Sequence, residues 1–158
     1  MTTVPTLHWY AIKAFWRRTS AIIESLEDKG IEYYSQSIMP SYLFVHTDRQ
    51  TIKHMQGNCY GKYYVYADRK SREPSVVPDK EIEVFRIVTS SGATGLEFLD
   101  DNPEKYQKGD KVRVTDGPFK GAEGYIIRIK KDRRLVVTIS GIAAIATSYI
   151  PPELLEKI

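Results

Sequence analysis

Three histidines and one cysteine are the side chains of this sequence that most readily take part in chemistry. His8, His46 and His54 are scattered, and none stands four residues from another histidine or from a cysteine. Because protein zinc sites need clustered histidine and cysteine ligands, we expect no metal site. Cys59 is the only cysteine and has no histidine beside it, so it is expected to be a packed side chain and not a nucleophile.

The sequence also lacks the short motifs that mark nucleotide cradles and nucleophile elbows. It contains no GxGxxG, no Walker-type Gly-Lys-Ser/Thr and no GxSxG. We therefore expect a protein that is not an enzyme and that binds no cofactor.

Length and composition indicate one or two small globular domains. The chain has 158 residues, of which 42% are apolar and 27% charged. It has no apolar run near the roughly 20 residues that cross a membrane, and residues 1–8 do not resemble a signal peptide. A single cysteine fits a reducing compartment. We expect a cytoplasmic protein without a membrane partner.

The charge is unevenly distributed. The formal net charge is +3, and all of the excess lies in residues 101–158, which hold 11 Lys and Arg against 8 Asp and Glu. This distribution is a mild indication of a polyanionic or acidic partner.

The elements that must position these residues fall into two groups. In residues 1–90, strand-like runs alternate with helical ones, which predicts an α/β domain with helices packed on a sheet. Strands are expected at 7–14, 31–34, 41–46, 63–66 and 75–77, and helices at 16–29, 50–56 and 78–89.

Residues 91–105 have the composition of a linker, and residues 106–158 read as a small all-β barrel. Its expected strands are short runs separated by Gly, Pro, Asp and charged turns, at 111–115, 124–130, 135–140 and 147–150, followed by one helical turn at 153–157.

Residues 108–124 resemble the KOW motif, which occurs in NusG-type transcription factors and several ribosomal proteins. The run is Lys-Gly-Asp-Lys-Val-Arg-Val-Thr-Asp-Gly-Pro-Phe-Lys-Gly-Ala-Glu-Gly. Gly109-Asp110 turns into an alternating strand, and Gly121 and Gly124 allow strands to cross closely. The resemblance implies an SH3-like barrel.

The N-terminal region resembles the NusG N-terminal (NGN) domain. The resemblance rests on Trp9-Tyr10, on Met39-Pro40-Ser41-Tyr42-Leu43-Phe44-Val45 and on Val76-Val77-Pro78. It covers residues 7–158 and is closest to specialised NusG paralogues of the RfaH and UpxY type. The hairpin that the family carries between positions 34 and 39 is nearly absent here.

The resemblance implies that the first domain binds the clamp helices of the largest RNA polymerase subunit. The residues that match are Tyr10, Met39, Tyr42 and Phe44. The alternative is that alternating strand residues beside helices simply form the core. The family's His-Thr-Thr contact to the gate loop of the second subunit corresponds to Lys53 and His54, followed by Met55-Gln56.

The start of the first predicted helix is a candidate nucleic-acid surface. In the family this region faces upstream DNA or the non-template strand, and here it holds Phe15, Trp16, Arg17 and Arg18. Aromatic rings and guanidinium groups suit single-strand binding through stacking and phosphate contact. The alternative is a solvated helix start with the tryptophan packed on the sheet.

The barrel of NusG-like proteins binds ribosomal protein S10 or the Rho factor, and Phe119 and Ile142 match that patch. Because Ser140 replaces the family's aromatic residue, stimulation of Rho is not expected. The lysine- and arginine-rich turn at 130–134 is expected to be either a contact to nascent RNA or a solvated turn.

Taken together, the resemblance implies a transcription elongation or antitermination factor for long operons, such as those for polysaccharide synthesis. The alternative is a KOW-type RNA-binding protein in ribosome assembly or translation.

Overall fold

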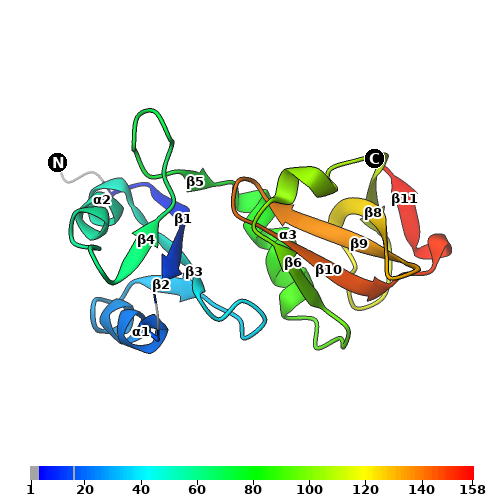
Figure 1. Ribbon diagram of the computed structural model, residues 1–158, viewed down its shortest axis with the longest axis horizontal. Coiled ribbons are helices and arrows are strands. Elements are labelled where there is room, and N and C mark those ends of the chain that lie inside the picture. Colours follow the sequence, from blue (N-terminus) through cyan, green and yellow to red (C-terminus); the bar gives the residue numbers. More distant parts are fainter. Residues whose placement is uncertain (1–3, 16) are drawn as a thin grey trace. The chain divides into compact units, whose positions relative to one another are not determined.

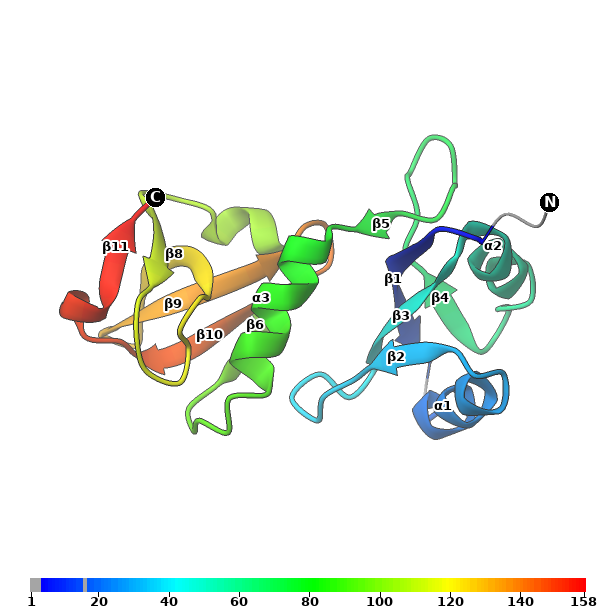
Figure 2. The ribbon, with the colours of Figure 1, turned by 180° about the vertical axis from the view of Figure 1, so that it is seen from behind.

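A computed structural model describes residues 4–15 and 17–158, and its contacts divide the chain into two units, Met1–Asp79 and Lys80–Ile158. Each unit is described by itself. Figures 1 and 2 show helices α1 and α2 beside the sheet of the first unit, and a β-rich second unit that carries helix α3.

The first unit is a five-stranded antiparallel sheet covered on one face by two helices. Its elements are β1 (Leu7–Ala14), α1 (Thr19–Asp28), β2 (Glu32–Tyr34), β3 (Tyr42–Asp48), α2 (Arg49–Gly57), β4 (Tyr63–Val65) and β5 (Val76–Val77). The strand order is β2-β3-β1-β4, and β5 also pairs with β1.

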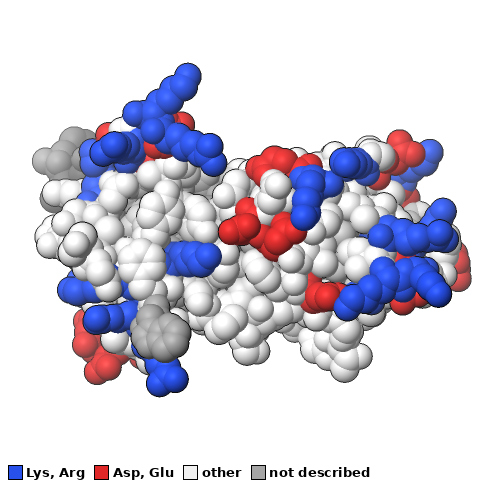
Figure 3. Space-filling view, viewed as in Figure 1, with Lys and Arg blue, Asp and Glu red and all other residues white. Residues whose placement is uncertain are grey.

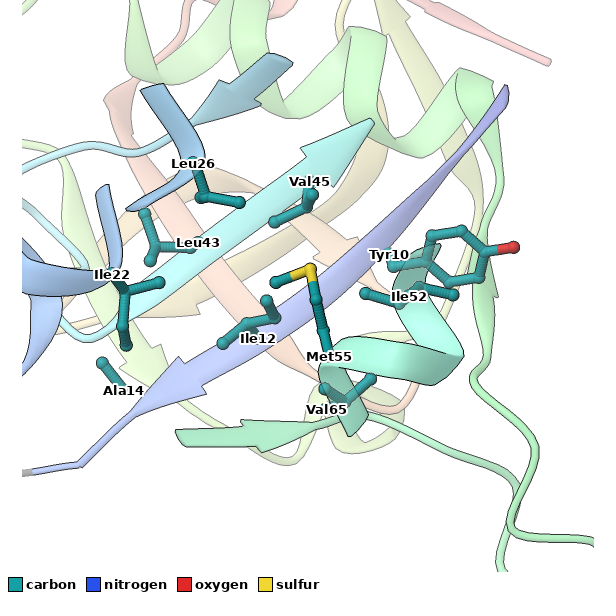
Figure 4. Packing of buried hydrophobic residues seen from close by; sticks show 10 residues of the cluster. All are labelled: Tyr10, Ile12, Ala14, Ile22, Leu26, Leu43, Val45, Ile52, Met55 and Val65. Atoms are coloured by element: carbon teal, nitrogen blue, oxygen red, sulfur yellow. The ribbon is translucent and has the colours of Figure 1, made fainter. Parts of the chain in front are cut away.

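The core of this unit lies between the sheet and its two helices (Figure 4). Strand residues alternate between faces, so Tyr10, Ile12 and Ala14 point to the helices together with Leu43 and Val45. The helices contribute residues spaced by three or four positions, which are Ile22 and Leu26 from α1 and Ile52 and Met55 from α2.

The second unit is helix α3 (Asp79–Thr89) followed by a six-stranded antiparallel sheet. Its strands are β6 (Glu97–Asp100), β7 (Lys111–Val114), β8 (Glu123–Ile129), β9 (Asp132–Ile139), β10 (Ala143–Tyr149) and β11 (Leu155–Lys157), with short 3-10 turns at Pro103–Tyr106 and Pro152–Leu154. The strand order is β11-β7-β8-β9-β10-β6.

Close strand contact in the second unit depends on one glycine. A Cβ atom at Gly124 would lie 2.2 Å from the carbonyl oxygen of Val136 on the facing strand β9. No side chain fits at that distance, which explains the glycine in β8.

The structure divides the chain between Asp79 and Lys80, and not at the predicted boundaries near residues 90 and 105. The predicted linker contains β6, which pairs with β10 through Phe98↔Ile145, so it is part of the second sheet. Helix α3 also belongs to the second unit, because Glu81 accepts hydrogen bonds from Ser140 (Oγ, 2.6 Å; backbone N, 3.2 Å) and Lys80 pairs with Glu123 at 2.6 Å.

Three element limits also differ from the predictions. Helix α1 begins at Thr19, three residues later than expected, and Arg17, two residues before this start, has a left-handed φ of 54°, so it is not part of a right-handed helix. Strand β10 begins at Ala143, four residues before its expected start, because its alanines pair with β9. The predicted last helical turn is instead a 3-10 turn followed by β11.

None of the helices in residues 4–15 and 17–158 has the length and apolar character that crossing a membrane requires.

Candidate functional site

The face of the first sheet that points away from α1 and α2 is rich in aromatic side chains, and we call it the aromatic face. Its members alternate with the core residues along each strand. They are Trp9, Ala11 and Lys13 on β1, Tyr42, Phe44 and His46 on β3, Tyr34 on β2, Tyr64 on β4, and Tyr66 just after β4.

Ring contacts join these side chains across strands. The rings of Trp9 and His46 stack at 4.7 Å between centroids, and the Tyr64 ring meets Tyr66 edge to face at 5.2 Å. Lys13 lies 5.4 Å from the centre of the Tyr42 ring, and Tyr42 stacks on Tyr66 at 6.5 Å. The contacts form two groups on this face, Trp9 with His46 and Lys13 with Tyr42, Tyr66 and Tyr64.

Burial differs strongly along this face. Phe44 and Met39 are 1% and 2% exposed and Tyr42 is 6% exposed, whereas Tyr64 is 46% exposed. Of the predicted polymerase-binding residues, Tyr42 and Phe44 therefore lie on the aromatic face, but a partner reaches them only in a conformation that exposes them.

The predicted grouping of Tyr10 with Tyr42 and Phe44 is wrong. Tyr10 pairs with Val45 in the β1–β3 register, so its side chain points to the opposite face and packs in the core, where it is 1% exposed. In Figure 4 its hydroxyl points away from the cluster. Burial raises the pKa of this phenol, with Arg49 lowering it and Asp48 raising it.

Lys53 and His54 lie on α2, and Lys53 belongs to a separate basic surface. We call this surface the basic ridge, and it consists of Arg49 and Lys53 from α2 and of Arg69, Lys70 and Arg72 from the loop between β4 and β5. Figure 3 shows Lys and Arg side chains gathered over that loop.

The loop of the basic ridge is held in place by its own hydrogen bonds. Asp68 accepts bonds from the backbone N–H groups of Ser71 (2.8 Å) and Lys70 (2.9 Å), and these bonds lower the pKa of the Asp68 carboxyl. Glu73 pairs with Arg49 at 2.6 Å and with Lys53 at 3.1 Å, which ties the loop to α2. Lys53 and His54 are exposed.

The candidate nucleic-acid residues lie before α1 and next to the turn before β4. Phe15 is 43% exposed and its N–H donates to the carbonyl of Lys62 at 3.0 Å, while Arg17 and Arg18 are exposed. Trp16 lies outside the residues that the structure describes. The turn adds Tyr60, which is 99% exposed.

A groove of 270 Å³ separates α1 from α2 beside this turn. Its rim carries Arg18, Lys29 and Lys62, and its wall is formed by Ile22 and Met55, among others. Tyr60 and Lys62 were not among the predicted residues, although an aromatic residue and a lysine flanking Gly61 fit the same single-strand pattern as residues 15–18.

The two predicted partner-binding residues of the second unit are buried, so they do not form an open patch. Phe119 is 4% and Ile142 is 3% exposed. Helix α3 contacts the loops that hold them, since Ile87 lies against Gly121 and Glu81 bonds Ser140. Binding through these residues requires a conformation that exposes them.

No group of three or more His, Cys, Asp or Glu side chains placed to hold a metal ion occurs among the described residues.

Comparisons with known proteins agree with this architecture. A family model described as "KOW motif" matches residues 108–140. The comparison with curated protein sequences gives no match. The chain is similar to a solved structure of NusG from Thermotoga maritima, described as "Domain interaction in Thermotoga maritima NusG", with a TM-score of 0.52, 18% identity, and coverage of 97% of this chain and 98% of that chain.

Two structures of the MjSpt4:Spt5 complex, conformations B and A, also match at 16% identity. Their TM-scores are 0.36 and 0.34. Each match covers 95% of this chain, and it covers 96% of the matched chain in conformation B and 97% in conformation A. The NusG likeness shows a shared fold, and the predicted fold class, an NGN-like α/β domain followed by a β-rich KOW domain, is confirmed.

Proposed function

From a KOW motif set in a NusG-like fold, we propose that this protein is a non-catalytic transcription elongation and antitermination factor that binds RNA polymerase. The aromatic face of the first sheet is the observation that carries the proposal. Its partner is the clamp-helix hairpin of the largest polymerase subunit, and its place of action is the cytoplasm.

The aromatic face suits a helical partner. Tyr, Trp and Phe give a large contact area for a small loss of side-chain entropy, and they are enriched among the residues that dominate binding energy. Tyr64 and Lys13 offer the first contacts, because they are at least partly exposed. Tyr42, Phe44 and Met39 contribute once they are uncovered.

Lys53 on the basic ridge and His54, the next residue of α2, are proposed to bind the gate loop of the second-largest subunit. Helix α2 covers the core face of the sheet, so these residues and the aromatic face point to opposite sides of the first unit. One unit with contacts on two sides is able to bridge two polymerase elements. A bridge that binds the closed clamp better than the open one favours continued transcription.

Phe15, Arg17 and Arg18, with Tyr60 and Lys62, are proposed to contact the non-template DNA strand or nascent RNA. Exposed rings stack on bases and the cations contact phosphates. Phe119 and Ile142 are proposed to bind ribosomal protein S10 in a conformation that exposes them. Long operons, such as those for polysaccharide synthesis, are the proposed targets.

A titration of core RNA polymerase with the fluorescently labelled full chain tests the proposal, in the absence of nucleic acid. Tyr64→Glu places a charge on the exposed part of the aromatic face, so we expect it to weaken binding at least tenfold. Tyr149→Glu is the matched control, because Tyr149 is an equally exposed tyrosine (55%) of the second unit; it is expected to bind as the unmodified chain does.

Absence of saturable binding by the unmodified chain would overturn the proposal. Equal loss of binding in both variants would also count against it. Salt-sensitive RNA binding without polymerase binding would favour the ribosome-assembly alternative, which the KOW motif at residues 108–140 also fits.

A further inference from the structure

The hairpin of β8 and β9 in the second unit has an unusual turn. Ile129 pairs with Asp132, so two residues, Lys130 and Lys131, make the turn, and both have positive φ angles of 51° and 74°. Such two-residue turns strongly favour Asn and Gly, because other residues with φ above zero are strained. Two lysines therefore stand where the backbone disfavours them, and strain of this kind points to a role for the side chains.

The strands beside this turn place two arginines directly opposite each other. Arg128 on β8 pairs with Arg133 on β9, which puts both side chains on the same face of the hairpin at about 5 Å between their Cβ atoms. Both are exposed. Like charges in such a cross-strand pair destabilise a sheet. An anion bound between the two guanidinium groups removes this repulsion.

The acidic residues nearby leave this pair uncompensated. Glu97 pairs with Arg134 at 2.9 Å and with Lys130 at 3.3 Å, and Asp132 is the acidic residue next to the turn. Among residues 4–15 and 17–158, no carboxylate forms an ion pair with Arg128, Lys131 or Arg133. Figure 3 shows basic side chains gathered at this end of the second unit.

The arginine pair borders a groove that has an apolar floor. The groove has a volume of 620 Å³, and both arginines line it together with Tyr149, Ile126 and Leu155. Tyr149 is 55% exposed. At the far wall Lys157 pairs with Asp110 at 3.0 Å. The groove thus combines two unpaired guanidinium groups with an accessible aromatic ring.

We propose that this groove and the Lys130-Lys131 turn form a binding site for single-stranded nucleic acid. Arg128, Arg133 and Lys131 contact consecutive phosphates, and a base stacks on Tyr149 above the apolar floor. A single strand fits because its bases are free to stack, whereas the bases of a duplex are not. The site is separate from residues 15–18 of the first unit and does not depend on polymerase binding.

Fluorescence anisotropy of the full chain with labelled 12-nucleotide oligo-U, oligo-dT and a duplex of equal length tests this proposal. The double variant Arg128→Gln/Arg133→Gln is expected to bind single strands about 10- to 30-fold more weakly near 0.1 M salt, and to lower the slope of log K against log salt by about 1.4. Tyr149→Ala is expected to weaken binding about fivefold or more without changing that slope.

Lys108→Gln/Lys120→Gln is the control, because it removes the same charge from exposed lysines of the second unit outside the hairpin. It is expected to leave binding nearly unchanged. Lys131→Gln, at the solvent-exposed turn, provides a milder test should the arginine variant fold poorly, and it is expected to weaken binding about fivefold. Binding of single-stranded RNA or of single-stranded DNA supports the proposal, and the tighter of the two shows which nucleic acid the site prefers.

Four results would overturn the proposal of a single-strand site. The first two are that the unmodified chain binds no single strand, or that the two double variants weaken binding equally. The other two are that the duplex binds as tightly as a single strand, or that poly-glutamate at equal charge concentration displaces oligo-U. The last result would indicate an acidic protein partner instead.

Discussion

Asp48 shows how one side chain fixes an element that carries binding residues. It ends β3 and caps α2, accepting hydrogen bonds from the backbone N–H of Thr51 at 2.7 Å and from the Thr51 hydroxyl at 2.9 Å. The backbone bond from Thr51 is the main reason that the pKa of Asp48 lies below its usual range, against the opposing effect of burial. Helix α2, with Lys53 and His54, begins at this cap.

Replacement of Asp48 by alanine is expected to destabilise α2 by about 1 kcal/mol, because the N–H groups of its first turn lose their acceptor. Amide hydrogen exchange of α2 in the full chain measures the effect. Because folding lowers this pKa, the stabilisation by the charged form is fully present above the unfolded value near 3.9 and is lost as the pH falls through the folded value.

Asp48→Asn serves as the control, since its amide oxygen still caps the helix but does not titrate in this range. It is expected to retain most of the protection at neutral pH and to remove this part of the acid dependence. Unchanged protection of α2 in Asp48→Ala would contradict the role of the cap.

Helices and strands with strong periodic patterns could be predicted from the sequence. The strands predicted at 7–14 and 41–46, observed at 7–14 and 42–48, follow from alternating aromatic and β-branched residues, and helix α2 follows from a capping aspartate. Strand β6 could not be predicted, because its residues form a strand only through pairing with β10. The same holds for the start of β10, where alanines have little strand preference of their own.

The candidate site was only partly predictable for a related reason. The alternation of side chains along β3 predicts that Tyr42 and Phe44 share one face of the sheet. Only the register between β1 and β3 shows that Tyr10 lies on the opposite face. The strand that holds Tyr64 was predicted, but only its pairing with β1 places Tyr64 beside Lys13 on the aromatic face. Burial of Phe119 and Ile142 depends on tertiary packing, which the local sequence pattern does not show.

The β8–β9 turn makes a prediction that links strain to binding. Lys130→Asn/Lys131→Gly supplies the residues that this turn favours, so we expect a stabilisation of about 1 kcal/mol. For a unit of about this size the melting temperature should rise by about 4–8 °C per kcal/mol. Single-strand binding should weaken at the same time, because two cations are lost.

Lys131→Gln separates the two effects, since it removes one charge but keeps a strained side chain in the turn. It is expected to weaken binding with no gain in melting temperature, measured by thermal unfolding followed by circular dichroism. A turn variant that gains no stability would show that the positive φ angles carry no cost.

At the scale of the whole molecule, the two units carry different kinds of binding surface. The first unit has an aromatic sheet face suited to a helical protein partner, together with the basic ridge. The second unit holds the KOW motif, the net positive charge of residues 101–158 and the strained lysine turn. This division fits a factor that binds the polymerase with one unit and nucleic acid or a further protein with the other.

Photo-crosslinking from the aromatic face tests the central claim most directly. Replacement of Tyr64 by photoreactive benzoylphenylalanine places the probe on an exposed position of that face, and the same replacement of Tyr149 provides the control. After irradiation with core RNA polymerase, mass spectrometry should locate the crosslink from position 64 in the clamp-helix hairpin of the largest subunit, with none there from position 149. A crosslink from position 64 to another part of the polymerase, or to none of it, would contradict the account.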